Sequence, residues 1–255
     1  MKWKAIGQSV TGISHAAVGK GCEDAVQYKV VQDTNDDEVL ICCVSDGAGS
    51  AQYAAWASGF TVKKMMDGLS DAIADAGQIT EALIYQIAEQ IYDGLNAEAE
   101  EKQVELNEFS GTLLGCCLAK ESAVFFQVGD GAIVRNDGSG YYIPVWWPHN
   151  GEYQNSTAFL IDDRAFGNLN IAIIGERVDE VAIFTDGLQM LTLNTEGRNV
   201  HQPFFTGLFR FLGMADDEEK VTVLNRKLHE YLDSNVINAR TDDDKTLFLA
   251  SRLSV

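Results

Sequence analysis

The sequence predicts an α+β fold in which mainly antiparallel sheets are flanked by long helices. Short apolar runs typical of strands outnumber the amphipathic stretches typical of helices. Neighbouring runs are separated by brief segments rich in turn residues, which favours antiparallel pairing. The few amphipathic stretches are long enough to cover a sheet from outside. Because the 255 residues contain no internal repeat and no linker, we expect one domain over residues 1–255.

The first half of the chain is predicted to contain three strands and two helices. The strands are expected at residues 2–10, 25–31 and 39–44, and the last is almost wholly apolar, which indicates a central position in a sheet. Residues 33–38 are expected to form the hairpin loop between the second and third strands. One helix is predicted at residues 51–66, and a longer one follows Thr80, a residue type that commonly caps helices.

The second half repeats the strand pattern. Its first four predicted strands lie at residues 113–119, 123–128, 132–135 and 141–145, and their short connections predict an antiparallel meander. After an irregular stretch at 148–170, we expect strands at 171–174 and 181–184, a helix at about 216–231 and a final strand at 247–253. Trp146 and Trp147 either cover the core at a strand end or form an aromatic rim for a peptide or partner protein.

Composition excludes several classes of protein. With 38 acidic against 19 basic residues the net charge is −19, which argues against a nucleic-acid binder. A hydrophobic content of 46% is too high for a disordered acidic tail. Residues 1–10 lack the apolar stretch of a signal peptide, and no apolar run approaches the length of a membrane span, so we expect a cytoplasmic protein that does not enter membranes. The five cysteines lack metal-binding or redox spacing and are interpreted as small, reduced core residues.

Aspartates recur where predicted strands end. Asp46, Asp130 and Asp186 each follow an apolar run and are each followed by glycine, and further acidic residues precede two other strands, at 23–24 and 242–244. In antiparallel sheets these strand ends and starts can meet at one edge. Clustered carboxylates repel one another unless cations hold them, and oxygen ligands suit Mg²⁺ or Mn²⁺. The alternative is that each Asp-Gly is simply a turn.

The motifs together resemble the metal-dependent PP2C-type protein serine/threonine phosphatases, in particular a compact bacterial branch of that family. The resemblance covers about residues 12–249 and is carried by six motifs in order: Cys22-Glu-Asp24, Val44-Ser-Asp-Gly-Ala-Gly49, Ser110-Gly-Thr112, Val128-Gly-Asp-Gly131, Phe184-Thr-Asp-Gly-Leu188 and Asp243-Asp-Lys-Thr246. It implies two antiparallel sheets packed as a sandwich between helices, with a flap-like insertion at about 145–170. It also implies hydrolysis of phosphoserine and phosphothreonine on proteins, by a water activated between two Mn²⁺ or Mg²⁺ ions.

The same resemblance implies site residues. Asp46 and Asp186 would be the catalytic carboxylates, with Asp46 bridging the two ions. The implied metal ligands are Glu23, Asp24, Asp46, Gly47 through its carbonyl, Asp130, Asp186 and Asp243, with Glu23 or Asp24 assisting the second ion and Asp130 belonging to a possible third one. No covalent phosphoenzyme is required. The implied partners are a phosphoprotein substrate and a cognate serine/threonine kinase.

Two positions depart from the family pattern. Gly19 stands where many relatives carry a phosphate-binding Arg, and Ala48 stands where some carry a His that acts as general acid. His15, Lys20 and His149 are the candidates for phosphate or substrate contact. The missing Arg favours an alternative, a catalytically weak or inactive phosphatase-like signalling scaffold, whereas retention of every acidic ligand position favours an enzyme.

Overall fold

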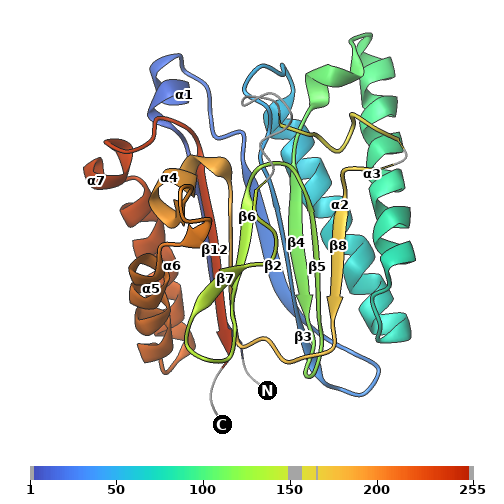
Figure 1. The fold of residues 1–255 in the computed structure, drawn as a ribbon. Helices are drawn as coiled ribbons and strands as arrows, with labels where there is room; N and C mark the ends of the chain where they lie inside the picture. The colour runs from blue at the N-terminus through green and yellow to red at the C-terminus, as the bar shows by residue number, and fades with distance from the viewer. Residues whose placement is uncertain (1–2, 149–156, 165, 253–255) are drawn as a thin grey trace. The chain divides into compact units, whose positions relative to one another are not determined.

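The computed structural model describes residues 3–148, 157–164 and 166–252. The chain forms two compact units, and each contains one five-stranded antiparallel sheet with helices beside it (Figure 1). Unit 1 comprises Met1–Cys22, Gly131–Trp147 and Val178–Val255, and unit 2 comprises Glu23–Asp130 and Pro148–Arg177. Two antiparallel sheets with long helices confirm the predicted α+β class. A single domain over residues 1–255 stays a prediction.

Unit 2 is built on a sheet with the strand order β2-β3-β4-β5-β8, in which every neighbouring pair is antiparallel. Its strands are β2 (Ala25–Gln32), β3 (Glu38–Ser45), β4 (Leu113–Leu118), β5 (Ala123–Val128) and β8 (Asn170–Ile174). The apolar strand β3 lies inside the sheet, as predicted, and it pairs with β2 across the predicted hairpin.

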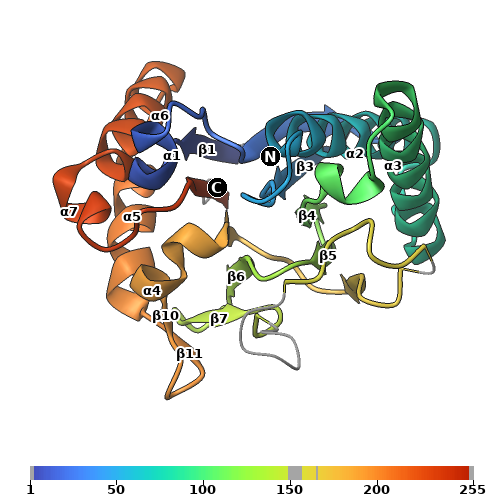
Figure 2. The same cartoon turned by 90° about the horizontal axis from the view of Figure 1, so that it is seen from above.

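Two long helices, α2 (Ala54–Ala76) and α3 (Glu81–Lys102), lie along one side of this sheet, as Figure 2 shows, and the short helix η1 (Leu106–Phe109) follows them. Thr80 is the N-cap of α3 as predicted, because its side chain accepts a hydrogen bond from the N–H of Leu83 at 3.2 Å. Helix α2 continues past its predicted end at residue 66 because Leu69 and Ile73 extend its buried face. Gly68 of α2 faces α3, and a Cβ there would lie only 2.9 Å from the side chain of Ile87. The absence of a side chain at Gly68 therefore lets the two helices approach each other closely.

Unit 1 has the strand order β1-β12-β9-β6-β7, again with antiparallel neighbours throughout. Its strands are β1 (Trp3–Val10), β12 (Lys245–Arg252), β9 (Glu180–Phe184), β6 (Ala132–Asn136) and β7 (Tyr142–Pro144). A separate two-stranded hairpin consists of β10 (Leu193–Asn194) and β11 (Asn199–Val200). The first and last strands of the chain therefore pair with each other, through eight consecutive residue pairs.

The helices of unit 1 are mostly short. They are α1 (Ile13–Ala17), η2 (Asp186–Leu188), α4 (Gln189–Thr192), α5 (Gln202–Met214), α6 (Glu218–Leu232) and α7 (Asn235–Asn238). Only α6 was predicted. Helix α5 escaped sequence analysis because its four phenylalanines and two glycines have poor helix propensity. Burial of Phe205, Phe209 and Leu212, which share one helical face, outweighs that propensity.

The predicted meander over residues 113–145 is wrong. Strands β4 and β5 pair with each other and so do β6 and β7, but β5 pairs next with β8 whereas β6 pairs with β9. The chain passes from one sheet to the other at Gly129, whose positive φ of 115° suits glycine. Alternating apolar residues identify a strand but do not identify its partner, so the short connection was misinterpreted as a hairpin.

Four of the five cysteines confirm their interpretation as core residues, whereas Cys22 is only half-buried. All five are free thiols, and four of them lie on the adjacent strands β3 and β4, two on each face of the sheet. We call these the four strand cysteines: Cys42, Cys43, Cys116 and Cys117. Burial raises the pKa of each of these four thiols well above its ordinary value. They therefore stay protonated and unreactive at neutral pH.

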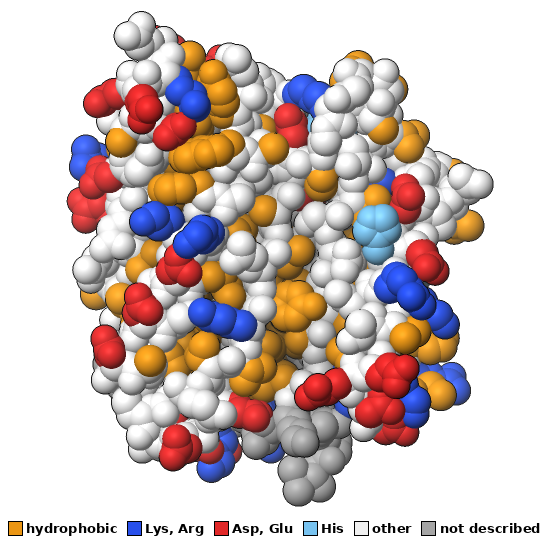
Figure 3. All heavy atoms as spheres, turned by 180° about the vertical axis from the view of Figure 1, so that it is seen from behind, with side chains coloured by type: hydrophobic (Ala, Val, Ile, Leu, Met, Phe, Trp, Pro, Cys, Tyr) orange, Lys and Arg blue, Asp and Glu red, His pale blue; other side chains and the backbone are white. Residues whose placement is uncertain are grey.

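On the face shown in Figure 3, acidic side chains are scattered among basic and hydrophobic ones. Among the described residues, no helix combines the length and apolar character needed to cross a membrane. Within the predicted flap at about 145–170, residues 149–156 and 165 lie outside the described residues, and Trp146 and Trp147 are half-buried beyond the end of β7.

Candidate active site

In unit 2, the Asp46-Gly47 strand end lies directly against the first acidic pair. The N–H of Gly47 donates a hydrogen bond to the carbonyl of Glu23 at 3.2 Å. A Cβ on Gly47 would lie 2.8 Å from that carbonyl oxygen and 2.7 Å from the carbonyl oxygen of Ala54, so only glycine fits here. The chain immediately after β3 is thus held against the segment that carries Glu23 and Asp24.

Thr112 fixes the backbone of Asp46. Its hydroxyl accepts a hydrogen bond from the N–H of Asp46 at 2.9 Å, and its own N–H donates to the carbonyl of Asp46 at 2.8 Å. The side chain of Thr112 is buried, so these bonds are protected from competing water. Sequence analysis gave Thr112 no role, although it belongs to the Ser110–Thr112 motif through which the chain resembles PP2C phosphatases.

The second Asp-Gly strand end approaches the same threonine. A Cβ on Gly129 would lie 2.5 Å from the methyl carbon of Thr112, which places the chain after β5 beside the chain after β3. Asp130, the next residue, accepts a hydrogen bond from the hydroxyl of Thr157 at 2.5 Å. Unit 2 therefore brings together two of the three predicted Asp-Gly strand ends.

The carboxylates of this part of unit 2 suit a hard cation. Glu23 is only 7% exposed and Asp24 only 8%, which is unusual because burial of a carboxylate loses hydration. Asp46 and the carbonyl of Gly47 would add two more oxygen donors, and oxygen ligands are the type that Mg²⁺ and Mn²⁺ prefer. In donor chemistry, the residues present thus fit the implied metal.

In unit 1, the third Asp-Gly strand end lies against the second acidic cluster. Asp186 begins η2, directly after β9, and a Cβ on Gly187 would lie 2.0 Å from the carbonyl oxygen of Asp244. The same Cβ would lie 3.5 Å from the Cβ of Asp243, which is exposed. The two ligands predicted in this unit, Asp186 and Asp243, therefore stand on neighbouring segments.

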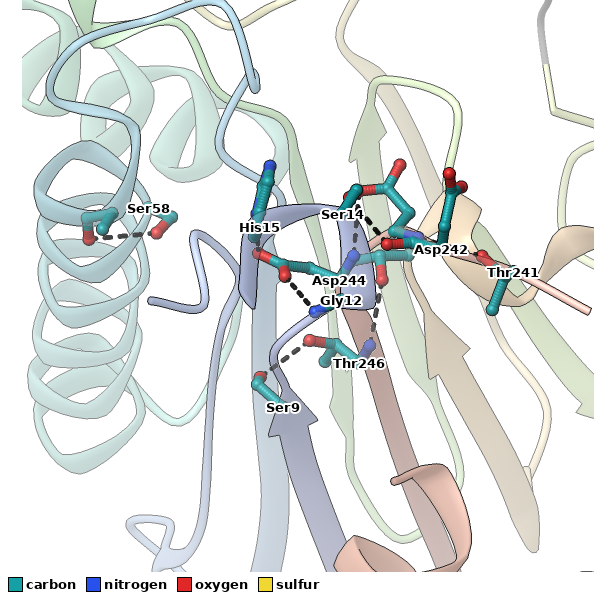
Figure 4. Close-up of polar contacts among 12 residues, drawn as sticks. Ser9, Gly12, Ser14, His15, Ser58, Thr241, Asp242, Asp244 and Thr246 are labelled. Carbon is teal, nitrogen blue, oxygen red and sulfur yellow. Dashed lines mark hydrogen bonds and ion pairs between the residues drawn. The ribbon is translucent and has the colours of Figure 1, made fainter. Parts of the chain in front are cut away.

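Helix α1 is attached to this acidic cluster by several polar contacts (Figure 4). The N–H of Gly12 donates to one carboxylate oxygen of Asp244 at 2.6 Å, and Nδ1 of His15 lies 3.0 Å from the other. The carbonyl of Asp242 accepts hydrogen bonds from both the N–H and the hydroxyl of Ser14, at 2.9 and 2.7 Å. The side chain of Asp244 is 3% exposed and that of His15 is 14% exposed, so the imidazole retains some access to solvent.

Asp244 is a residue that sequence analysis missed. Within the run of three aspartates at 242–244, only the resemblance selected Asp243, and nothing in the pattern marks its neighbour as buried. The structure shows that Asp244 positions His15, one of the three candidates for phosphate contact. Of the other two, Lys20 is exposed, and His149 lies outside the described residues.

Gly19, which replaces the usual Arg, has a positive φ of 75° and no atom within 4 Å of a Cβ built on it. Ala48, which replaces the His of some relatives, is held by a hydrogen bond from its N–H to the carbonyl of Ser110 at 3.0 Å. Neither replacement leaves a group at that position able to bind phosphate or transfer a proton through its side chain. Any such group must come from elsewhere in the chain.

Metal binding by the complete ligand set stays a prediction. Across residues 3–148, 157–164 and 166–252, no group of three or more His, Cys, Asp or Glu side chains is arranged to hold a metal ion. What the structure supplies is the local pairing within each unit: Asp46-Gly47 with Glu23, and Asp186-Gly187 with Asp243 and Asp244.

Comparisons of the sequence and of the structure with known proteins point to the same family. Residues 11–233 match the model of the family described as protein phosphatase 2C. The chain is 34% identical over 252 residues to serine/threonine-protein phosphatase 3 of Escherichia coli strain K12, covering 98% of each chain. It shares its fold with the serine/threonine phosphatase Stp1 from Staphylococcus aureus, with a TM-score of 0.62, 17% identity and coverage of 100% of this chain and 96% of that one. It also resembles RsbX, solved in complex with magnesium, with a TM-score of 0.55, 15% identity and coverage of 98% and 94%. On this evidence the chain belongs to the protein phosphatase 2C family.

Proposed function

We propose that this phosphatase hydrolyses phosphoserine and phosphothreonine on proteins with the help of two divalent ions, Mn²⁺ or Mg²⁺. The proposed ligands are Asp46, the Gly47 carbonyl, Asp186 and Asp243, assisted by Glu23 or Asp24. Its support comes from the E. coli relative named as a serine/threonine-protein phosphatase and from the magnesium in the RsbX structure. A cognate kinase and a cytoplasmic location stay predictions.

One observation carries the proposal. In each unit, an Asp-Gly strand end is pressed so closely against a second acidic segment that no other residue could replace its glycine. A turn that only connected two strands would not need this contact. In solvent, mutual repulsion would move its carboxylate away from the second acidic segment. Two such contacts, at Gly47 and at Gly187, therefore favour a shared chemical purpose for the carboxylates beside them.

The bound ions would supply an acidified water and stabilisation of the charge that develops on the transferred phosphoryl group. The chain's own residues would supply position. Thr112 holds the backbone of Asp46 through two hydrogen bonds, which fixes the point on the main chain from which that carboxylate extends. Asp244 holds His15 by Nδ1, and this contact supports the proposal that the imidazole binds phosphate in the absence of the usual Arg.

The decisive experiment measures hydrolysis of p-nitrophenyl phosphate and of a phosphothreonine peptide while Mn²⁺ is titrated. Activity should require the metal, and Asp46→Asn should lower kcat/KM by about 100-fold or more, because one metal-binding charge is lost. Asp71→Asn, on the exposed side of α2, is the matched control and should change nothing. A loss of only a few-fold in Asp46→Asn would contradict the bridging role.

The same samples test the scaffold alternative. Calorimetric titration of the wild-type chain with Mn²⁺ should show tight binding at two or more sites. Asp130→Asn should remove only the weakest of these if Asp130 serves a third ion. An intact fold with no tight Mn²⁺ binding and no hydrolysis would instead establish a non-catalytic signalling module.

A further inference from the structure

Unit 1 carries an exposed apolar groove of about 430 Å³ where the end of α5 meets the start of α6. It is lined by five apolar side chains and three charged ones: Phe211, Met214, Ala215, Val223 and Leu224, with Asp217, Glu219 and Lys220. Phe211 is 61% exposed and Met214 is 66% exposed. We call these eight residues the α5–α6 groove.

The apolar side chains in the groove are not surplus core residues. Helix α5 buries a separate face, with Phe205, Phe209 and Leu212, against its own sheet. Phe211 and Met214 are three residues apart, so they lie beside each other on the opposite, solvent-facing side. Single exposed apolar residues are ordinary, but two large ones at the mouth of a groove are typical of an interaction site.

The rim of the groove is acidic. Asp216, Asp217, Glu218 and Glu219 are consecutive and all exposed. The ammonium group of Lys220 forms an ion pair with Asp216 and lies 3.8 Å from Asp217. The segment 216–220 therefore carries four carboxylates and one ammonium group, a formal charge of −3. Two further cations on these helices, Arg210 one turn before Met214 and Lys227 one turn after Val223, are not among the residues that line the groove. Lys4 is buried and donates to the carbonyl of Gly213.

The negative charge beside the groove indicates which kind of ligand can bind there. An anionic membrane surface would be repelled by this rim, although its apolar interior would suit Phe211 and Met214. A second copy of the chain docking on the same face would place acidic rim against acidic rim. We propose that the α5–α6 groove binds a segment of a partner protein in which large apolar side chains are flanked by Lys or Arg, since only such a segment matches both the apolar floor and the acidic rim.

The groove is remote from the predicted metal ligands of its own unit. In the β1–β12 ladder, Val10 pairs with Lys245, next to the Asp243-Asp244 segment, whereas Lys4 pairs with Ser251 and reaches the end of α5 at Gly213. Six residues of extended strand separate Lys4 from Val10, which is about 20 Å. The groove and the acidic cluster thus lie at opposite ends of β1, so docking would recruit a partner without contacting the reacting phosphate.

The test uses the full chain and a fluorescein-labelled 14-residue amphipathic peptide with Leu at positions i, i+3, i+4 and i+7 and Lys flanking them. A second peptide with Glu in place of every Lys is the charge control. Fluorescence anisotropy at 150 mM salt should show saturable binding of the Lys peptide only. The double variant Phe211→Ser/Met214→Ser should weaken that binding about tenfold or more. Tyr141→Ser removes an equally exposed aromatic elsewhere in unit 1 and should leave binding unchanged.

A second variant tests the rim independently of the apolar floor. Glu218→Gln/Glu219→Gln removes two of the three net charges without touching Phe211 or Met214, and it should weaken the Lys peptide several-fold and reduce the salt dependence of binding. Hydrolysis of p-nitrophenyl phosphate should be unchanged in all of these variants. That readout separates failure of this proposal from failure of the catalytic one.

Several results would overturn the proposal. They are no saturable binding of the Lys peptide to the wild-type chain, equal binding of the Glu peptide, or unchanged affinity in both double variants. Binding to phosphatidylserine vesicles that is lost in Phe211→Ser/Met214→Ser would assign the groove to membranes instead. A concentration-dependent dimer that is lost in the same variant would assign it to a second copy of the chain.

Discussion

Replacing Gly187 with Ala should damage both stability and catalysis, because the new methyl group has no room. A Cβ at this position would lie 2.0 Å from the carbonyl oxygen of Asp244, and real Cβ atoms essentially never approach another atom within 3.0 Å. The obstacle is backbone rather than a flexible side chain. The Asp186-Gly187 segment and the Asp243-Asp244 segment must therefore separate by about 1 Å or more.

The size of each effect follows from that displacement. Overpacking of this kind costs about 1–3 kcal/mol of unfolding free energy. A shift of about 1 Å between catalytic groups is enough to lower a rate about 100-fold. We therefore expect Gly187→Ala to lower the urea midpoint and to reduce kcat/KM for p-nitrophenyl phosphate far more than it reduces the folded population at 25 °C.

The matched control is Gly207→Ala in the middle of α5. It makes the same chemical change in the same unit, but nothing lies within 4 Å of a Cβ at that position. Alanine favours a helix over glycine by about 0.5–1 kcal/mol, so this control should raise the urea midpoint and leave kcat/KM unchanged. Equal urea midpoints and equal rates for Gly187→Ala and the wild-type chain would refute the close approach of the two acidic segments.

Three further outcomes are expected. Thr112→Val keeps the shape of the buried side chain but leaves the N–H of Asp46 without its acceptor, so it should lower the unfolding free energy by about 1–3 kcal/mol and also lower kcat/KM. An unchanged kcat/KM would show that Thr112 does not position Asp46. Thr80→Ala removes the N-cap of α3 and should lower the unfolding free energy by about 1 kcal/mol at constant kcat/KM, and a fall in kcat/KM would contradict a purely structural cap. Burial raises the pKa of each of the four strand cysteines, so above the unfolded thiol pKa of about 8.5 only the unfolded state ionises. The unfolding free energy should therefore be unaffected below that pH and fall above it by about 1.4 kcal/mol per pH unit for each thiol. Urea unfolding at pH 7.5, 8.5 and 9.5 measures that loss, a flat profile would contradict it, and a thiol reagent at pH 7.5 should label only Cys22 in the folded chain.

Local pattern was a reliable guide to individual elements in this chain. The strand at 39–44, the cap at Thr80 and the amphipathic stretch that became α6 were recognisable because each depends on neighbouring residues. Pattern failed where distant residues decide the outcome. Helix α5 forms because Phe205, Phe209 and Leu212 are buried against a sheet formed by strands from both ends of the chain, and local propensity does not report that burial.

The candidate site divides in the same way. The order of the motifs was enough to select Asp46, Asp130, Asp186 and Asp243, because Asp-Gly after an apolar run is a local signal. The supporting residues were not visible in that signal. Thr112 and Asp244 matter through hydrogen bonds to residues 66 and 232 positions away.

By itself, the sequence determined the α+β class, most of the strands, the reduced thiols and the family motifs, since periodicity and short motifs depend on residues close together in the chain. The tertiary structure alone decided that β5 and β6 belong to different sheets and that β1 pairs with β12. It also decided which of three consecutive aspartates is buried against His15. Those outcomes depend on which apolar surfaces bury each other away from water. Local sequence does not determine this, because the surfaces belong to segments that are distant in the chain.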